Sequence, residues 1–132
     1  MVAVPAEIME KLKSPGATKI LVTASKEGQP HAIVCGSIIF PAEDKVAVGE
    51  ILMKRAAKYL EENGKAAILA AEGPVSYELV LKNPQRVAEG PALDEMNANL
   101  AKANLKARAL WIFDVAEVYD EGAGPNAGNK VA

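Results

Sequence analysis

VAVGEILMKRAAKYLEENG, the stretch from Val46 to Gly64, decides the fold. Its first residues have the apolar, β-branched character of a short strand, a glycine-containing passage follows, and the remainder has the composition of a helix. We therefore predict a strand over Lys45 to Gly49 and a helix over about Leu52 to Glu62. Asn63 and Gly64 end this helix, because glycine just past the last turn is a common C-cap.

Two cations, Lys54 and Arg55, lie near the predicted start of this helix. A helix N-terminus carries roughly half a positive charge, so cations in the first turn are unfavourable unless an anion binds between them. Backbone N–H groups, a lysine charge and a guanidinium fork together suit a phosphate monoester. The alternative is a pair of solvated cations on a surface helix, and a helix that begins at Glu50 would favour it. The residues alone leave both interpretations open.

The composition predicts one folded domain that contains a core. Of 132 residues, 50% are hydrophobic, and the net charge of −2 gives no broad basic surface for nucleic acid or an anionic membrane. The apolar runs are too short to span a bilayer, and the N-terminus does not resemble a signal peptide, so we expect a soluble cytoplasmic protein. Cys35 is the only cysteine, and with a single histidine the chain favours neither a disulfide nor a metal site.

The N-terminal part reads as a helix followed by a β-hairpin. We predict a short amphipathic helix over Pro5 to Lys13 and a strand over Thr18 to Ala24, followed by a hairpin loop over residues 26–29. The next strand, Pro30 to Phe40, is apolar on both faces. Such a strand suits a barrel wall whose outer face is covered by another element or subunit, and a homodimer is the simplest source of that cover.

The C-terminal part reads as short strands, a helix and a long last strand. We predict strands over Lys65 to Ala71, Tyr77 to Leu81 and Gln85 to Glu89, a helix over about Ala92 to Ala103, and a final strand over Ala107 to Tyr119. Residues 120–132 lack a hydrophobic period, so we expect a tail that is disordered or docked on a partner. This order favours an antiparallel barrel with accessory helices over a doubly wound parallel sheet.

Three stretches carry a resemblance to a known family: residues 27–40, residues 48–69 and residues 106–119. Together they resemble the FMN-binding split barrel of the pyridoxamine 5′-phosphate oxidase-like proteins, most closely the small bacterial FMN-binding proteins. The resemblance implies a mainly β fold, an antiparallel six-stranded split barrel over residues 1–119. It also implies a homodimer with FMN at the dimer interface.

The resemblance also implies a set of cofactor contacts. Lys54 stands in the place of a family lysine beside the FMN phosphate, and Arg55 stands in the place of its small hydroxyl neighbour. The strand around Ser37, with Cys35 and Gly36, would pass near the ribityl chain or the phosphate. Val48, Gly49 and Glu50 would pass near the isoalloxazine edge through their backbone groups. Lys106, Arg108 or Trp111 of the other subunit would complete the site. The predicted cofactor-binding residues are Ser37, Val48, Gly49, Glu50, Lys54 and Arg55.

The family implies an oxidoreductase or electron-transfer flavoprotein, for which the sequence identifies neither an electron donor nor an acceptor. No catalytic residue is assigned, since Asp114 and Glu117 fall on opposite strand faces and make a poor acid–base pair. Family members carry more side-chain donors on the strand at residues 34–37. This difference motivates an alternative: a non-catalytic module that binds haem through His31 or another ligand, or a dimer without cofactor. Trp111 and Phe113 are interpreted as core residues and Cys35 as a small buried hydrophobe.

Overall fold

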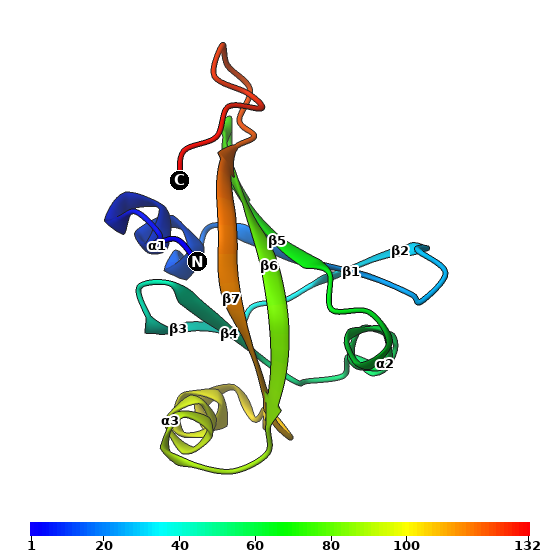
Figure 1. Ribbon diagram of the computed structural model, residues 1–132. Helices are drawn as coiled ribbons and strands as arrows, with labels where there is room; N and C mark the ends of the chain where they lie inside the picture. Colours follow the sequence, from blue (N-terminus) through cyan, green and yellow to red (C-terminus); the bar gives the residue numbers. More distant parts are fainter.

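One antiparallel sheet of seven strands forms the body of the protein, and three helices lie around it (Figure 1). The computed structural model describes all residues, 1–132. In chain order the elements are α1 (Ala6–Lys13), β1 (Thr18–Ala24), β2 (Pro30–Val34), β3 (Ile38–Ala42), β4 (Lys45–Gly49), α2 (Lys54–Glu62), β5 (Ala66–Glu72), β6 (Val75–Val87), α3 (Pro91–Leu100), the 3₁₀ turn η1 (Ala101–Ala103) and β7 (Leu110–Asp120).

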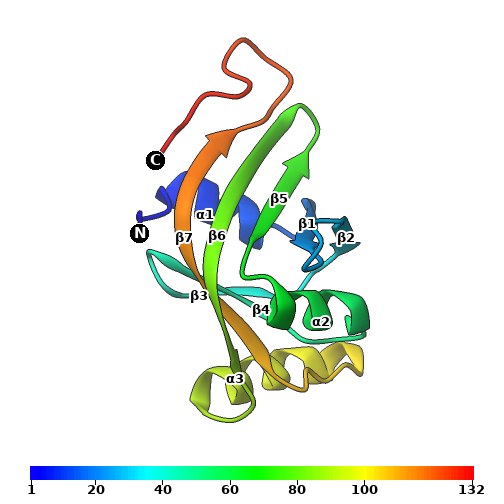
Figure 2. The ribbon, with the colours of Figure 1, turned by 45° about the vertical axis from the view of Figure 1, so that its right-hand side comes forward.

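The strand order is β2-β1-β5-β6-β7-β4-β3, with the two N-terminal hairpins at the two ends of the sheet. The long strands β6 and β7 join these halves, and the sheet curves around a core of 19 buried residues (Figure 2). Phe113, Leu21 and Ile68 are among its fully buried side chains. The mainly β, antiparallel split-barrel prediction is confirmed. None of the helices has the length and apolar composition needed to cross a membrane.

The predicted strand Pro30 to Phe40 is wrong as a single strand. It divides at Cys35, Gly36 and Ser37 into β2, which pairs with β1, and β3, which pairs with β4. The Cys35 N–H still donates to the Lys19 carbonyl, whereas the Ser37 carbonyl accepts from Gly49 on the other half of the barrel. The break therefore occurs where the chain crosses between the two halves.

The predicted strands Tyr77 to Leu81 and Gln85 to Glu89 are one strand, β6. Its register against β7 shifts between Lys82 and Gln85, and Asn83 between them adopts a left-handed conformation with φ of 54°. Lys82-Asn83-Pro84 therefore forms an irregularity inside a strand, because β7 is long enough to pair on both sides of it. One predicted strand is thus divided and two others are fused, so the number of strands remains seven. The family resemblance implied six.

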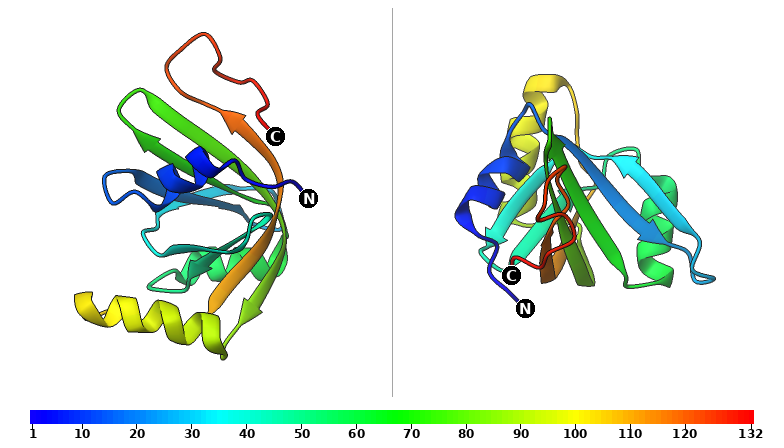
Figure 3. Two further views of the ribbon diagram at one scale, coloured as in Figure 1. Left: turned by 90° about the vertical axis from the view of Figure 1, so that its left-hand side faces the viewer. Right: turned by 90° about the horizontal axis from the view of Figure 1, so that it is seen from above.

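Helix α3 covers part of the outer face of the sheet. Leu93 and Met96 pack with Ala107 and Leu110 in a second apolar cluster, and partly buried residues from β3, β6 and β7 lie against it. Figure 3 shows α3 alongside one end of the sheet. The chain itself therefore supplies some of the outer cover for which the sequence predicted another element or a second subunit.

The last residues of the chain return to β7. The Val118 N–H donates to the Ala132 carbonyl, and the Val131 N–H donates to the Val118 carbonyl. Tyr119 also forms an isolated antiparallel bridge with Lys130. This part of β7 lies beyond the residues that pair with β4, so the tail takes the position of an additional strand there.

Gly49, the last residue of β4, marks a close approach of α3 to the sheet. A Cβ atom at this position would lie 2.5 Å from the Met96 sulfur and 3.3 Å from the Cβ atoms of Ala107 and Ser37. We expect Gly49→Ala to lower the free energy of unfolding by about 1–3 kcal/mol, because the cost of overpacking falls on three neighbours at once. Urea denaturation measures this. The control is Gly36→Ala, where an added Cβ meets no atom within 4 Å, and an equal loss in both variants would contradict the prediction.

Candidate functional site

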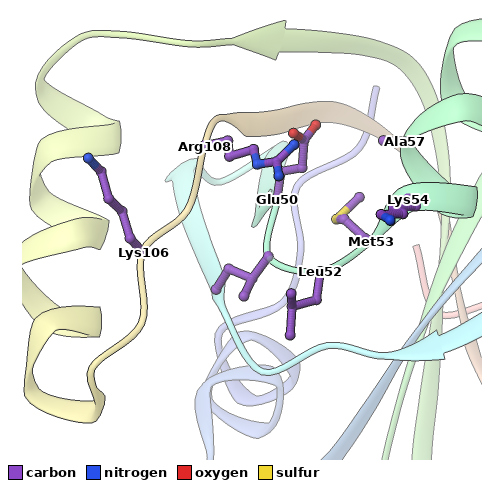
Figure 4. A pocket seen from close by; sticks show the side chains of 8 residues that line it. Glu50, Leu52, Met53, Lys54, Ala57, Lys106 and Arg108 are labelled. Carbon is purple, nitrogen blue, oxygen red and sulfur yellow. The ribbon is translucent and has the colours of Figure 1, made fainter.

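The segment from Glu50 to Met53, which links β4 to α2, lies where three adjoining cavities meet. The cavities have volumes of about 360, 380 and 200 Å³, and Met53 lines all three. The larger two fall within the range of about 300–1,000 Å³ that small-molecule sites occupy. Figure 4 shows Glu50, Leu52 and Met53 along this segment, with Lys54 at the start of α2 and Lys106 on the side of α3.

The backbone of this segment leaves a run of donors without acceptors. None of the N–H groups from Ile51 to Ala56 donates to a protein oxygen, whereas the N–H groups of Gly49 and Glu50 just before them do. Leu52 adopts a left-handed conformation with φ of 53° and is 97% exposed. Both features are unfavourable for leucine, and strained backbone of this kind gathers at ligand sites. The segment thus offers consecutive backbone donors to an anion.

Helix α2 begins at Lys54, so Lys54 and Arg55 occupy its first turn. The helix thus begins two residues after the predicted start at Leu52, and the alternative start at Glu50 is wrong. Both cations therefore face the positive end of the helix dipole. The first turn contains no acidic residue, no side chain caps it, and neither cation forms a salt bridge. An anion at this position would interact favourably with the helix dipole, the free N–H groups and both side chains.

Arg55 and His31 both contact the aromatic ring of Tyr59. The Arg55 guanidinium lies 5.6 Å from the ring centre, and the His31 ring meets it edge-on at 5.7 Å. Burial and the nearby Arg55 charge both lower the pKa of His31 below its ordinary value of 6.5. His31 is therefore neutral at pH 7, and it lines the same cavity as Lys54 and Arg55.

The Glu50 carboxylate is held by two side chains from neighbouring strands. Its two oxygens accept from Nε and Nη2 of Arg86 on β6, each at 3.0 Å, and one also accepts from Nε1 of Trp111 on β7 at 2.8 Å. Its backbone N–H donates to the Ala109 carbonyl, and its carbonyl accepts from the Arg108 N–H. Because only 8% of Glu50 is exposed, these contacts fix both the residue and the point at which the chain leaves β4.

These hydrogen bonds also keep Glu50 ionised. Those from Arg86 are the largest influence and lower the pKa of Glu50 below its ordinary value of 4.5, against the opposing effect of burial. The Trp111 hydrogen bond and the charge of Arg108 lower this pKa further. The cavity wall therefore contains a carboxylate that is already balanced by its own partners.

The other predicted site residues separate into two groups. Ser37 and Gly49 line the smallest cavity, together with Cys35, Gly36 and Met53. Val48 is fully buried in the core and pairs with both β3 and β7, so its side chain does not reach these cavities. Burial raises the pKa of the Cys35 thiol to about 11, which suits its interpretation as a small buried hydrophobe.

Lys106 and Arg108 line the cavity of about 360 Å³, in the same chain as Lys54. Within one chain they lie here because the segment after α3 returns beside Glu50. The contribution that the family resemblance implies from these residues of the other subunit stays a prediction. Trp111 is 3% exposed, so its prediction as a core residue is confirmed.

Sequence reasoning missed Arg86, Leu52 and Met53. Arg86 reaches Glu50 only because the irregularity in β6 resets its register against β7, and no local pattern indicates that pairing. Leu52 and Met53 read as ordinary apolar residues of a helix. The signal that was present is the absence of any acidic or capping side chain at residues 51–53, directly before Lys54.

Comparisons with known proteins place this geometry in a recognised fold. No family model and no curated protein matches the sequence. Among solved structures, HupZ of group A Streptococcus has a TM-score of 0.79 at 19% identity, over 95% of this chain and 100% of that chain. An FMN-binding protein from Syntrophomonas wolfei has a TM-score of 0.75 at 13% identity, over 86% of each chain. HutZ, the haem storage protein from Vibrio cholerae, has a TM-score of 0.65 at 14% identity, over 92% of this chain and 97% of that chain.

This protein therefore has the split-barrel fold of the pyridoxamine 5′-phosphate oxidase-like proteins, as the three sequence stretches had indicated. Because these identities are below 20%, the conclusion concerns the fold alone. The structures that share this fold include both an FMN-binding protein and a haem storage protein.

Glu50 gives the site a testable pH dependence. Its folded-state pKa is lowered, so its contribution to stability is present above the ordinary pKa of 4.5 and is lost as the pH falls through the folded value. We expect Glu50→Gln to lower the melting temperature at pH 7, because Arg86 loses its anionic partner. The difference from wild type should shrink steadily below about pH 4.5. Thermal unfolding from pH 7 to pH 3 measures this, and a difference that is constant with pH would contradict it.

Proposed function

We propose that this protein is a flavoprotein that binds FMN with its phosphate at the start of α2. The observation that carries the proposal is the run of free N–H groups from Ile51 to Ala56, next to two cations that form no salt bridge, with no acidic residue in the first turn of α2. A phosphate monoester satisfies several donors at once and removes the repulsion of Lys54 and Arg55 by the helix dipole. The likeness in fold to an FMN-binding protein supports the same cofactor.

Each predicted residue has a role in this proposal. Lys54 supplies a point charge to the phosphate, and Arg55, held over Tyr59, supplies a planar pair of donors. Ser37 and Gly49 form the wall of the adjoining cavity, which would receive the less charged part of the cofactor. Val48 contributes by fixing β4 in the sheet, since its side chain is buried.

Glu50 would act by position rather than by proton transfer. Its carboxylate is held by Arg86 and Trp111, so it fixes the backbone from which the donors of Ile51 and Leu52 project. Bound FMN would supply acceptance and donation of a hydride or of electrons. The protein's own contribution would be to bind the phosphate, orient the ring along residues 50–53 and exclude water with Met53 and Ile51. No side chain in the site is proposed as a nucleophile or general acid, and the reaction class proposed is oxidoreductase or electron transfer.

We also propose that the functional unit is a homodimer whose interface borders the site. Val34 is 74% exposed and Leu105 is 43% exposed, and both line the same cavity as Ser37 and Gly49. Exposed apolar side chains grouped around a cavity are typical of interaction surfaces. A second copy would cover them and narrow the opening of the cofactor site.

Haem is the second candidate ligand. Its specific support is His31, whose imidazole is neutral at pH 7 and lines a cavity of about 380 Å³ together with Lys54 and Arg55. A neutral imidazole can ligate iron, and the cations would pair with haem carboxylates. The fold is also that of a haem storage protein. We prefer FMN because several consecutive backbone donors match the oxygens of a phosphate group better than they match a haem carboxylate.

The FMN proposal predicts direct binding by the purified protein. We expect quenching of flavin fluorescence and a shifted visible spectrum. Replacing Lys54 and Arg55 together with glutamine should weaken binding by about tenfold or more, since each charge-assisted contact contributes about 1.5–3 kcal/mol. Lys58→Gln is the matched control, because Lys58 is exposed on the same helix one turn further along. Failure of FMN to bind, together with haem binding that His31→Ala abolishes, would favour the alternative.

The dimer proposal predicts a change of mass with a single substitution. We expect Val34→Asp to shift the protein from dimer to monomer in sedimentation equilibrium and to weaken FMN binding, because it buries a charge in the proposed interface. Val75→Asp is the control, since Val75 is 37% exposed on a strand but lies at the β5–β6 hairpin, away from these cavities. A monomeric wild-type protein would contradict the dimer.

A further inference from the structure

We propose that His31 and Tyr59 are positioning residues, which through successive ring contacts hold the Arg55 guanidinium in place for the anion bound at the start of α2. This inference rests on the proposed function only in taking the start of α2 as the place of that anion. The contacts themselves are argued from β2, from α2 and from the pairing of β2 with β1.

The Arg55 guanidinium interacts with the side chain of Tyr59, one turn further along α2. Its Cζ lies 5.6 Å from the centre of the Tyr59 ring, and its Nη2 donates to the Tyr59 hydroxyl at 3.4 Å. Arg55 is exposed and forms no salt bridge. Because an exposed arginine side chain has many rotamers, the contact with the ring is what restricts the guanidinium to one region of the helix surface.

His31 fixes the Tyr59 ring from the side of the sheet. The two ring centres are 5.7 Å apart and the ring planes meet at 87°, an arrangement that aromatic pairs favour. His31 lies on β2 opposite Thr23 of β1, so strand pairing sets its backbone position. Burial and the charge of Arg55 lower the pKa of His31, so the imidazole is uncharged at pH 7 and adds no second cation beside the guanidinium.

Helix α2 is attached to the β1–β2 hairpin at a second point. The Nδ2 of Asn63, at the C-terminal end of the helix, donates to the Ser25 carbonyl at 3.0 Å. Two contacts spaced along one helix prevent it from turning about either of them. The position of Tyr59 relative to β2 is therefore fixed by the fold rather than by the two rings alone.

Tyr59 acts through Arg55 and does not touch the anion in this proposal. Tyr59 lines none of the three cavities at the site, whereas Arg55 lines the cavity of about 380 Å³. A guanidinium that is already oriented loses less freedom on binding, and it presents its planar pair of donors to the phosphate oxygens. The ring contacts thus raise the affinity for the anion without contributing a contact to it.

The test of Tyr59 measures FMN affinity by fluorescence titration and pyrophosphate affinity by isothermal calorimetry. We expect Tyr59→Leu to weaken both by about two- to fivefold, the range of an exposed cation–π contact, and Tyr59→Phe, which keeps the ring, to change them by less than about twofold. In an Arg55→Gln background, Tyr59→Leu should have no further effect. An equal loss in both backgrounds would assign Tyr59 a general role in the stability of α2 and overturn the proposal, as would equal losses in Tyr59→Phe and Tyr59→Leu.

The test of His31 uses a conservative replacement. His31→Phe keeps an aromatic ring against Tyr59 and should leave FMN affinity within about twofold of wild type, whereas His31→Ala should weaken it about as much as Tyr59→Leu. Phenylalanine neither ligates iron nor binds phosphate, so retained affinity in His31→Phe separates positioning from a direct contact by the imidazole. Equal losses in His31→Phe and His31→Ala would overturn the positioning role of His31.

Failure of this inference and failure of the flavin proposal give different results. If FMN does not bind but pyrophosphate affinity shows the expected dependence of Tyr59→Leu on Arg55, the flavin proposal fails and the positioning role stands. If FMN binds and the effects of Tyr59→Leu and Arg55→Gln simply add, the positioning role is overturned and the flavin proposal stands. If neither FMN nor pyrophosphate binds, both are overturned.

Discussion

The buried carboxylate of Glu50 is the interaction on which the site depends. It joins the end of β4 to Arg86 on β6 and to Trp111 on β7. A buried anion is stable only when it is paired and hydrogen-bonded, so the chain can leave β4 in few other ways while these contacts are made. The direction of residues 51–53, the left-handed Leu52 and the start of α2 at Lys54 all follow from that exit. An interaction between three strands thus determines where a loop presents its N–H groups.

The sequence predicts the elements of this fold well and their connections less well. The helix ending at Glu62 and the apolar strands follow from local composition and periodicity, whereas the sequence leaves the start of the helix open. The break at Gly36 and the continuous β6 do not follow from them, because each depends on which partner strand is available and for how long. The same limit applies to the site. Lys54 and Arg55 are recognisable from an electrostatic conflict within one segment, whereas Arg86 is brought to Glu50 by pairing between distant segments.

The site contains one buried ion pair and, beside it, an excess of positive side chains. Glu50 and Arg86 neutralise one another, while Lys54, Arg55, Lys106 and Arg108 form no salt bridge. The net charge of −2 means that acidic residues outnumber basic ones, yet no acidic residue forms a salt bridge with any of these four cations. The local excess of positive charge is therefore a property of how the fold arranges the sequence rather than of its composition.

The return of the tail to β7 affects how the molecule meets its neighbours in concentrated solution. Strands whose hydrogen-bonding groups face solvent recruit other strands, and long exposed edges promote aggregation. Beyond Asp114, β7 has no β4 residues left to pair with, and residues 129–132 occupy that position through Val118 and Asp120. The chain thereby pairs this edge with its own end, and the last residues of β7 are shielded from strand addition by other chains.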